Sequence, residues 1–305
     1  TQKTIRAATP AAVFRKVMME QLSPAFVGFS VFVFGMLIGS FLNVVIYRVP
    51  RRESIAFPGS HCPACNVAIK PYDNIPVVSY AMLRGRCRNC EAGISPIYPA
   101  IELLVAALYL GVFFIVINQY PDMGTRFWLT LIADVLFVSL IVPLVFIDLR
   151  YKLLPNVITY PGFALMVVMR VLAPDPWLVA RTPKLYGGAT PEWITALTGA
   201  LVGAAVGGGS LWLVREAYYR LRHVEGMGLG DVKMMLMVGA FLGWQLTLLT
   251  IFLASLLGSV IGIMLIKMRG GNMKMEIPFG VFLGPASVVA LFVGQGLLDW
   301  YLKML

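Results

Sequence analysis

Eight long apolar runs alternate with shorter polar segments along the chain. A helix needs about 20 apolar residues to cross the hydrocarbon core of a bilayer, and most of the runs reach that length. The pattern therefore predicts an all-α polytopic membrane protein with about eight transmembrane helices. The expected spans are 25–47, 99–118, 127–147, 155–173, 193–214, 232–245, 246–267 and 281–301, with only Gly243-Trp244-Gln245 between the sixth and the seventh.

The polar segments divide the chain into four parts. Residues 1–24 form an N-terminal tail in which AAVFRKVMMEQL has the amphipathic pattern of a helix lying on a membrane surface. The first transmembrane helix is expected at 25–47, and residues 48–98 form a polar insertion after it. Residues 99–305 hold the remaining spans. We therefore expect one membrane domain that carries a small polar domain near its beginning.

Composition agrees with this picture. Hydrophobic residues make up 59% of the chain and charged residues 13%. Such a chain is too apolar for a soluble domain, and a single soluble core would not need runs of membrane length. The lipid bilayer is the expected environment of the protein.

Lys and Arg are distributed unevenly between the two sides of the predicted membrane domain. If residues 48–98 are cytoplasmic, loops on that side hold fifteen of the 25 basic residues, as the positive-inside rule requires. The other side keeps Arg126, Arg181, Lys184, Lys303 and the basic residues of the tail. The net charge of +10 is then mostly a topology signal, and nucleic acid is not an expected partner.

All four cysteines lie in the polar insertion, as the pairs Cys62/Cys65 and Cys87/Cys90. Two CxxC pairs can place four thiolates around one tetrahedral Zn²⁺. Two disulfides are disfavoured in a cytoplasmic loop, and a redox CxxC would not need a duplicate. Four thiolates leave no open position for water, and so small a domain lacks a core of its own, so we expect the zinc to be structural.

Two acidic residues stand at the ends of apolar runs, Asp148 in FVSLIVPLVFIDLR and Asp231 in GMGLGDVKMM. An ionisable residue there is costly, which favours a function. Taken singly, Asp148 could be an interfacial charge and Asp231 a helix N-cap. The topology puts both on one side of the membrane, where two facing carboxylates can share a proton and activate water for attack on an amide. We expect them to be a catalytic pair.

Other polar and small residues leave more than one interpretation open. Glu102 falls in the first turn of the second span, where either the helix dipole or a function accounts for an acid. Asn43 needs a hydrogen-bond partner inside the bundle or at its edge. The glycines of GALVGAAVGGG, in the fifth span, predict close helix packing. A transporter could also bury paired acids, but inverted repeats or acids near mid-span would then be expected.

GSFLNVVIYRVP, the CPAC and CRNC pairs, FIDLRYKLLPN and GMGLGD occur in this order between residue 35 and about residue 240. Together they resemble the type IV prepilin peptidases, membrane aspartyl proteases of the GxGD class. Members of this family cleave the basic leader of type IV prepilins and type II secretion pseudopilins after a glycine, on the cytoplasmic side. They then methylate the new N-terminal residue with S-adenosylmethionine.

The resemblance implies catalysis by Asp148 and Asp231, with Gly228 and Gly230 as the motif glycines. It implies zinc ligation by Cys62, Cys65, Cys87 and Cys90, methyltransferase activity because the cysteine segment is present, and a place in the bacterial cytoplasmic (inner) membrane with the active site and zinc domain facing the cytoplasm. The motif glycines permit positive φ and close approach of another segment. In PFGVFLGPA at 278–286, Val281 stands where a proline is expected, and this segment is expected to border the site. S-adenosylmethionine would bind between the zinc domain and adjoining helix ends.

Overall fold

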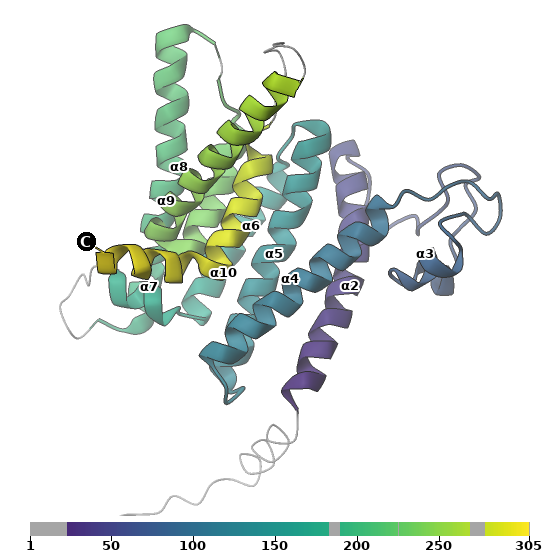
Figure 1. The fold of residues 1–305 in the computed structure, drawn as a ribbon, viewed down its shortest axis with the longest axis horizontal. Helices are drawn as coiled ribbons and strands as arrows, with labels where there is room; N and C mark the ends of the chain where they lie inside the picture. Colours follow the sequence, from purple (N-terminus) through teal and green to yellow (C-terminus); the bar gives the residue numbers. More distant parts are fainter. Residues whose placement is uncertain (1–22, 183–189, 225, 269–277, 305) are drawn as a thin grey trace, which may run out of the picture.

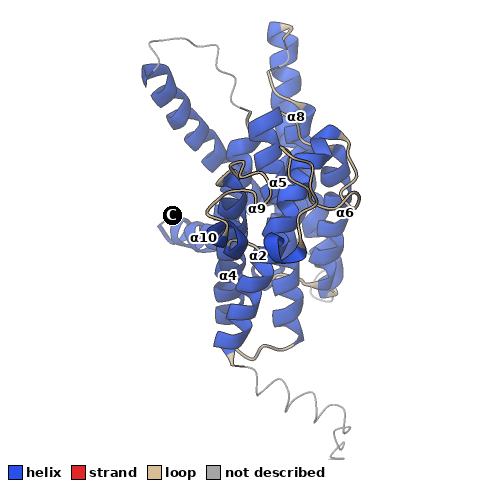
Figure 2. Ribbon diagram, turned by 90° about the vertical axis from the view of Figure 1, so that its right-hand side faces the viewer, coloured by secondary structure: helices blue, strands red, loops and turns tan. Residues whose placement is uncertain are grey.

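The computed structural model describes residues 23–182, 190–224, 226–268 and 278–304. The N-terminal tail predicted at 1–24 lies almost entirely outside these residues. The long helices form a bundle, and the polar insertion stands beside one end of it, to the right in Figure 1. Among the described residues there is no strand (Figure 2).

Across the described residues, seven helices make up the bundle, and shorter elements fill some of the connections. The bundle helices are α2 (Pro24–Arg48), α4 (Ile97–Gln119), α5 (Thr125–Tyr151), α6 (Asn156–Leu172), α8 (Glu192–Arg222), α9 (Leu229–Met268) and α10 (Gly280–Met304), and the shorter elements are α3 (Val78–Met82), α7 (Pro176–Arg181), η1 (Val49–Arg51) and η2 (Pro71–Asn74). The expected all-helical membrane architecture is confirmed.

The expected number of spans is not confirmed. Within the described residues, six helices are long and apolar enough to cross a membrane, and α6, with 17 residues, is shorter. The runs predicted at 232–245 and 246–267 belong to one element, α9, which is broken at Gly243 (φ 77°, ψ 170°). Glycine adopts this conformation without a steric penalty, so the chain changes direction with no polar loop.

Small residues set the closest helix contacts, as the sequence predicts for the fifth span. In α8, a methyl group placed on Gly203 would lie 2.1 Å from the carbonyl oxygen of Gly239 in α9. In α2, a methyl group on Gly39 would lie 2.7 Å from the Cα of Glu102 in α4. The backbones of α8 and α9, and of α2 and α4, approach each other only because these side chains are absent.

α5 occupies the centre of the bundle and packs against α2, α4, α6 and α10. Its core residues Phe137 and Ile141 are at most 1% exposed. Phe137 stacks on Phe241 of α9, with ring centroids 4.7 Å apart. This stacking contact joins α5, which carries Asp148, to α9, which carries Asp231.

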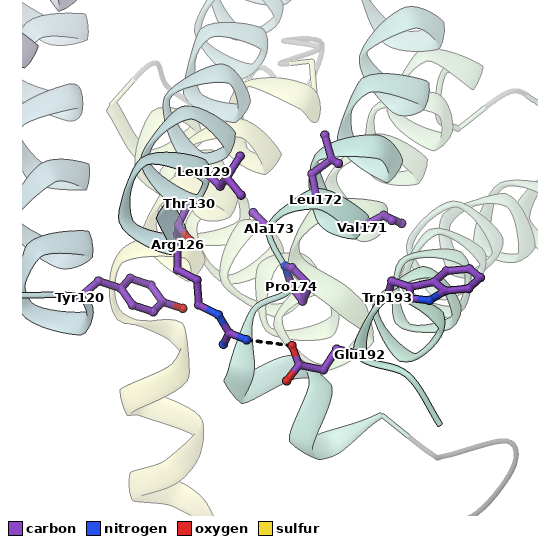
Figure 3. Close-up of a pocket in the computed structure, with 10 residues that line it drawn as sticks. All are labelled: Tyr120, Arg126, Leu129, Thr130, Val171, Leu172, Ala173, Pro174, Glu192 and Trp193. Carbon is purple, nitrogen blue, oxygen red and sulfur yellow. Dashed lines mark hydrogen bonds and ion pairs between the residues drawn. The ribbon is translucent and has the colours of Figure 1, made fainter. Parts of the chain in front are cut away.

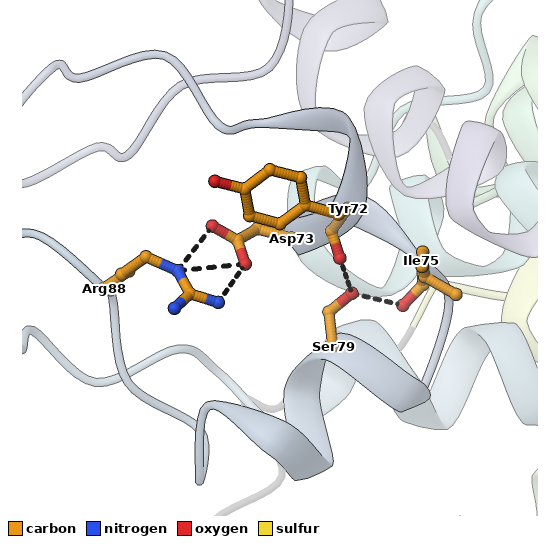
Figure 4. Close-up of polar contacts among 5 residues, drawn as sticks. All are labelled: Tyr72, Asp73, Ile75, Ser79 and Arg88. Carbon is orange, nitrogen blue, oxygen red and sulfur yellow. Dashed lines mark hydrogen bonds and ion pairs between the residues drawn. The ribbon is translucent and has the colours of Figure 1, made fainter.

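The polar insertion is held by polar contacts. Arg88 donates to both carboxylate oxygens of Asp73, with the shortest N···O distance 2.6 Å, and Ser79 Oγ donates to the carbonyl oxygens of Tyr72 and Ile75 (Figure 4). The hydrogen bonds from Arg88 lower the pKa of Asp73, so this pair stays ionised at neutral pH. Apart from Cys62, no hydrophobic residue between 52 and 96 is a buried core residue.

Candidate active site and cysteine cluster

Asp148 and Asp231 lie at the same end of the bundle and are both buried, at 4% and 7% exposure. Asp148 is in the last turn of α5 and Asp231 in the first turn of α9. A methyl group placed on Gly280 would lie 2.6 Å from Asp148 Oδ2 and 3.3 Å from Asp231 Oδ1. Because both distances start from the same point, Asp148 Oδ2 and Asp231 Oδ1 are separated by less than about 6 Å. The structure brings the predicted pair together.

α10 lies between the two acidic helices, and it packs against both α5 and α9. It begins at Gly280, in the predicted bordering segment 278–286. The main-chain N–H of Gly280 faces Asp231, and that of Val281 faces Asp148. The first N–H groups of a helix have no intrahelical acceptor and can bind an anion, and that of Val281 also donates to the carbonyl oxygen of Pro278 at 3.4 Å. The missing proline at Val281 leaves one such N–H in place.

The sequence analysis did not predict that Gly280 lies beside both acids. The feature that could have indicated it is its position at the start of a predicted helix, on the same predicted side of the membrane as the acids. Asp148 Oδ2, which faces it, is buried and has no hydrogen-bond partner within the described residues. A buried carboxylate oxygen without a partner is costly, and it suits a shared proton or a reacting water.

The two motif glycines differ in what surrounds them. A methyl group on Gly230 would lie 2.9 Å from Cβ of Leu154, just beyond the end of α5. Gly230 therefore allows the beginning of α9 to approach the end of α5. A methyl group on Gly228 would have room, since the nearest described atoms beyond its chain neighbours are the main-chain nitrogen of Gly230 at 3.8 Å and Asp231 Oδ2 at 4.0 Å. Neither glycine uses the positive φ that the residue type permits, since among the described glycines only Gly85 and Gly243 have it.

The four cysteines form a compact cluster of free thiols. Their Sγ atoms all lie within 4.8 Å of one another, and Cys62 and Cys90 are 3.8 Å apart. Sulfurs bound to one tetrahedral Zn²⁺ at about 2.3 Å have separations close to these. The donor set and its spread fit a single metal ion. His61 lies outside the cluster, with Nδ1 3.2 Å from the carbonyl oxygen of Gly59.

Each CxxC pair forms the same kind of turn. The N–H of Cys62 donates to Val67, and the N–H of Cys87 donates to Ala92. Main-chain N–H groups of Cys90 and Asn89 lower the pKa of Cys87 to about 7. A lowered pKa favours the thiolate, which is the form that binds a metal.

Glu102 and Asn43 connect elements at the base of the insertion. Asn43 Nδ2 donates to the carbonyl oxygen of Tyr98 at 3.1 Å. Glu102 Oε2 accepts the main-chain N–H of Val77 at 2.7 Å. Val77 has φ 60° and ψ −48°, an unfavourable conformation for a β-branched residue. Glu102 lies beyond the first turn of α4, where the sequence placed it, and its hydrogen bond to Val77 anchors the polar insertion to α4.

Two cavities lie away from the acids. One, of about 340 Å³, is at the opposite end of the bundle, where Arg126 and Glu192 form an ion pair of 3.0 Å (Figure 3). The other, of about 330 Å³, lies between α2 and the polar insertion. Its wall includes Ser40, Arg48, Ser60 and Asn74.

The fold and the site together define a multi-pass helical membrane protein with a buried pair of carboxylates and a four-cysteine insertion. Residues 33–116 match the bacterial peptidase A24 N-terminal domain, and residues 135–263 match the type IV leader peptidase family.

Relatives match over nearly the whole chain. The prepilin leader peptidase/N-methyltransferase of Aeromonas salmonicida is 36% identical over 298 residues, covering 90% of this chain and 93% of the relative. The protein of the same name from Pseudomonas aeruginosa is 34% identical over 294 residues, covering 88% and 91%. This chain belongs to the type IV leader peptidase family. No solved structure matches it significantly, and nothing in these relatives supports a transporter.

Proposed function

We propose that this protein is a prepilin leader peptidase and N-methyltransferase. It cleaves the basic leader of type IV prepilins and type II secretion pseudopilins after a glycine, and it then methylates the new N-terminal residue. The observation that carries the proposal is the buried pair Asp148 and Asp231, which meets at one end of the bundle around Gly280. The family and its relatives support it.

The pair is arranged for hydrolysis of a peptide bond by water. Two carboxylates this close do not both ionise readily, so the resting pair holds one proton. The ionised carboxylate takes a proton from the attacking water, and the protonated one gives its proton to the carbonyl oxygen or the leaving amine. The N–H groups of Gly280 and Val281 hold the two carboxylates in place during this exchange.

The site suits a substrate that is half in the membrane. A prepilin presents an apolar helix preceded by a cationic leader, and a site at the end of the bundle meets their junction without moving charge into lipid. A glycine before the cleaved bond has no side chain to obstruct the narrow space between the acids.

We propose that the acids and the insertion face the cytoplasm of a bacterium, across its inner membrane. Arg51 of η1, Arg150 of α5 and Arg220 of α8 all lie in helix turns at the end where the acids lie. A basic cytoplasmic side follows the positive-inside rule.

Two groups complete the proposed activity. Cys62, Cys65, Cys87 and Cys90 would hold a structural Zn²⁺ that supplies the insertion with the stability it lacks from apolar burial. S-adenosylmethionine supplies the methyl group. The cavity of about 330 Å³ between α2 and the insertion fits the expected place for it, with the polar side chains of Ser40, Arg48 and Asn74 on its wall.

The test uses the purified full chain in detergent, with a peptide that has a basic leader, a glycine and an apolar helix. Asp148→Ala and Asp231→Ala should each abolish cleavage, whereas Glu192→Gln, an exposed acid at the other end, should not affect it. Retained cleavage in both Asp variants would refute the peptidase assignment. Transfer of labelled methyl to the cleaved product tests the second activity.

A further inference from the structure

Arg170 is a buried cation that the cleavage chemistry does not use. It lies near the end of α6, distant from the two acids along the bundle, and is 6% exposed. Its Nη2 donates to the main-chain oxygen of Phe241 in α9, and the guanidinium lies over the Phe241 ring at 4.9 Å. A buried charge is costly unless it is paired or hydrogen-bonded, so its position requires an explanation.

The carbonyl that Arg170 binds belongs to the end of a half-helix. The break at Gly243 ends the first half of α9, and the last carbonyls of a helix have no intrahelical donor. Arg170 supplies a donor to one of them. Leu178 of α7 packs on the break itself, where a methyl group on Gly243 would lie 2.1 Å from Leu178 Cδ1. The half-helix is thus held at its far end by α6 and α7.

Arg170 also acts on α5. The positive charge of Arg170 reaches Asp134 on that helix and favours its ionised form. At 1.5 Å per residue, Asp134 is about 21 Å along α5 from Asp148, and Phe241 is about 15 Å along α9 from Asp231. α6 packs against both helices. Arg170 therefore interacts with both helices that carry the acids, through a hydrogen bond to α9 and through its charge on α5. Both interactions lie at the helix ends away from the acids.

A simpler explanation for the buried position of Arg170 is that it neutralises the charge of Asp175. The geometry does not favour this explanation. The distance from Nη1 to Asp175 Oδ2 is 3.8 Å, and Arg170 Nε has no hydrogen-bond partner within the described residues. Asp175 has other partners, since it accepts from Gln295 Nε2 at 2.9 Å and from the N–H of Leu178 at 3.1 Å. The direct hydrogen bond of Arg170 goes to Phe241.

We propose that Arg170 is a positioning residue of the peptidase. By binding the Phe241 carbonyl from α6, which packs against α5, it sets the axial position of the first half of α9 relative to α5, and so the separation of Asp231 from Asp148. The inference rests on the proposed function, because that separation matters only if the two acids act together.

The test measures cleavage kinetics of the full chain in detergent, on the same leader peptide, for four variants. Arg170→Met removes the hydrogen bond and the charge, and Arg170→Lys keeps a cationic donor. Arg170→Met combined with Asp134→Asn removes both charges, so that the variant can fold without leaving the Asp134 carboxylate beside an apolar side chain. Arg126→Met is the matched control, an arginine at the same end in an exposed ion pair.

We expect kcat to fall about 10- to 100-fold in Arg170→Met and in the double variant, because a misplacement of about 1 Å at reacting groups has effects of this size. KM should stay unchanged, and the pH profile should change because the interaction of the two acids depends on their separation. Arg170→Lys should recover part of kcat, and Arg126→Met should match the parent.

The double variant decides the outcome if Arg170→Met does not fold. A parental kcat and pH profile in the double variant, or a rise in KM with kcat intact, would overturn the positioning role. Asp231→Ala separates the two levels of inference. If it abolishes cleavage while the Arg170 variants behave as the parent, only the positioning role fails, and if it retains cleavage, the proposed function fails as well.

Discussion

Gly280 lies where a side chain would collide with both carboxylates. The nearest atoms to an added methyl group are Asp148 Oδ2 and, slightly further away, Asp231 Oδ1. These are the ends of side chains that could rotate away, so the fold can absorb the change. The catalytic geometry cannot, because the atoms that would move are the reacting ones.

Gly280→Ala should therefore reduce cleavage by about 100-fold or more while leaving the protein folded, because small displacements of reacting groups have large effects on rate. Cleavage of the leader peptide and elution as a monodisperse species measure the two parts of this expectation. Gly296→Ala in the same helix is the control, because no atom lies within 4 Å of the added methyl group. Equal rates in the two variants would show that the pair tolerates the displacement.

Sequence patterns predicted the site role of Asp148 but could not predict that of Gly280. Asp148 and Asp231 were predicted as a pair because an acid beside a long apolar run is conspicuous, and because topology assigns both to one side. Gly280 carries no charge, and its role arises only when α10 docks between α5 and α9. Such a role depends on tertiary packing, which no local pattern contains.

At the scale of elements, Glu102 makes one of the buried contacts between the polar insertion and the bundle, and Arg48 of α2 makes others by donating to the carbonyl oxygens of Ser54 and Gly59. Glu102 of α4 accepts the N–H of Val77, which holds a main-chain conformation that valine adopts reluctantly. Sequence patterns placed Glu102 in the first turn of a helix, where a dipole partner was an equal alternative. They could not show the partner, since Val77 belongs to an irregular turn.

Glu102→Ala should release this contact and impair methyl transfer, which we assign to the insertion, with little effect on cleavage. We expect a loss of about tenfold, equivalent to about 1.4 kcal/mol of lost positioning. Glu102→Gln keeps an acceptor oxygen and should retain most of the activity. Val77→Gly in the Glu102→Ala background tests the turn separately, because glycine adopts positive φ without cost. Methyl transfer at the parental rate in Glu102→Ala would contradict the anchoring role.

The helix count shows a second limit at the scale of elements. The runs at 232–245 and 246–267 were correctly separated at Gly243-Trp244-Gln245, because two helices meet there at a kink within α9. Hydropathy measures only the length of apolar chain. Whether two adjacent runs form two spans or one broken helix depends on the side chains around the break, here Arg170 and Leu178.

At the scale of the whole molecule, the two proposed activities lie in parts with different sources of stability. The acids are held by α5, α9 and α10, whose packing is apolar. The insertion has almost no buried apolar side chains, and its four thiols are its most compact feature. We propose that this insertion folds only when its four thiolates bind a metal, as other small domains without an apolar core do.

Removal of the metal should therefore separate the activities. A strong thiol-competing chelator, or Cys62→Ser combined with Cys87→Ser, should unfold the insertion, which hydrogen exchange at residues 62–92 would detect as lost protection. Methyl transfer should disappear, whereas cleavage of the leader peptide should continue, because the acids are held by α5, α9 and α10. Protection in α5 and α9 provides the internal control. Loss of cleavage while those helices remain protected would mean that the insertion takes part in peptide hydrolysis, and that the two activities share one site.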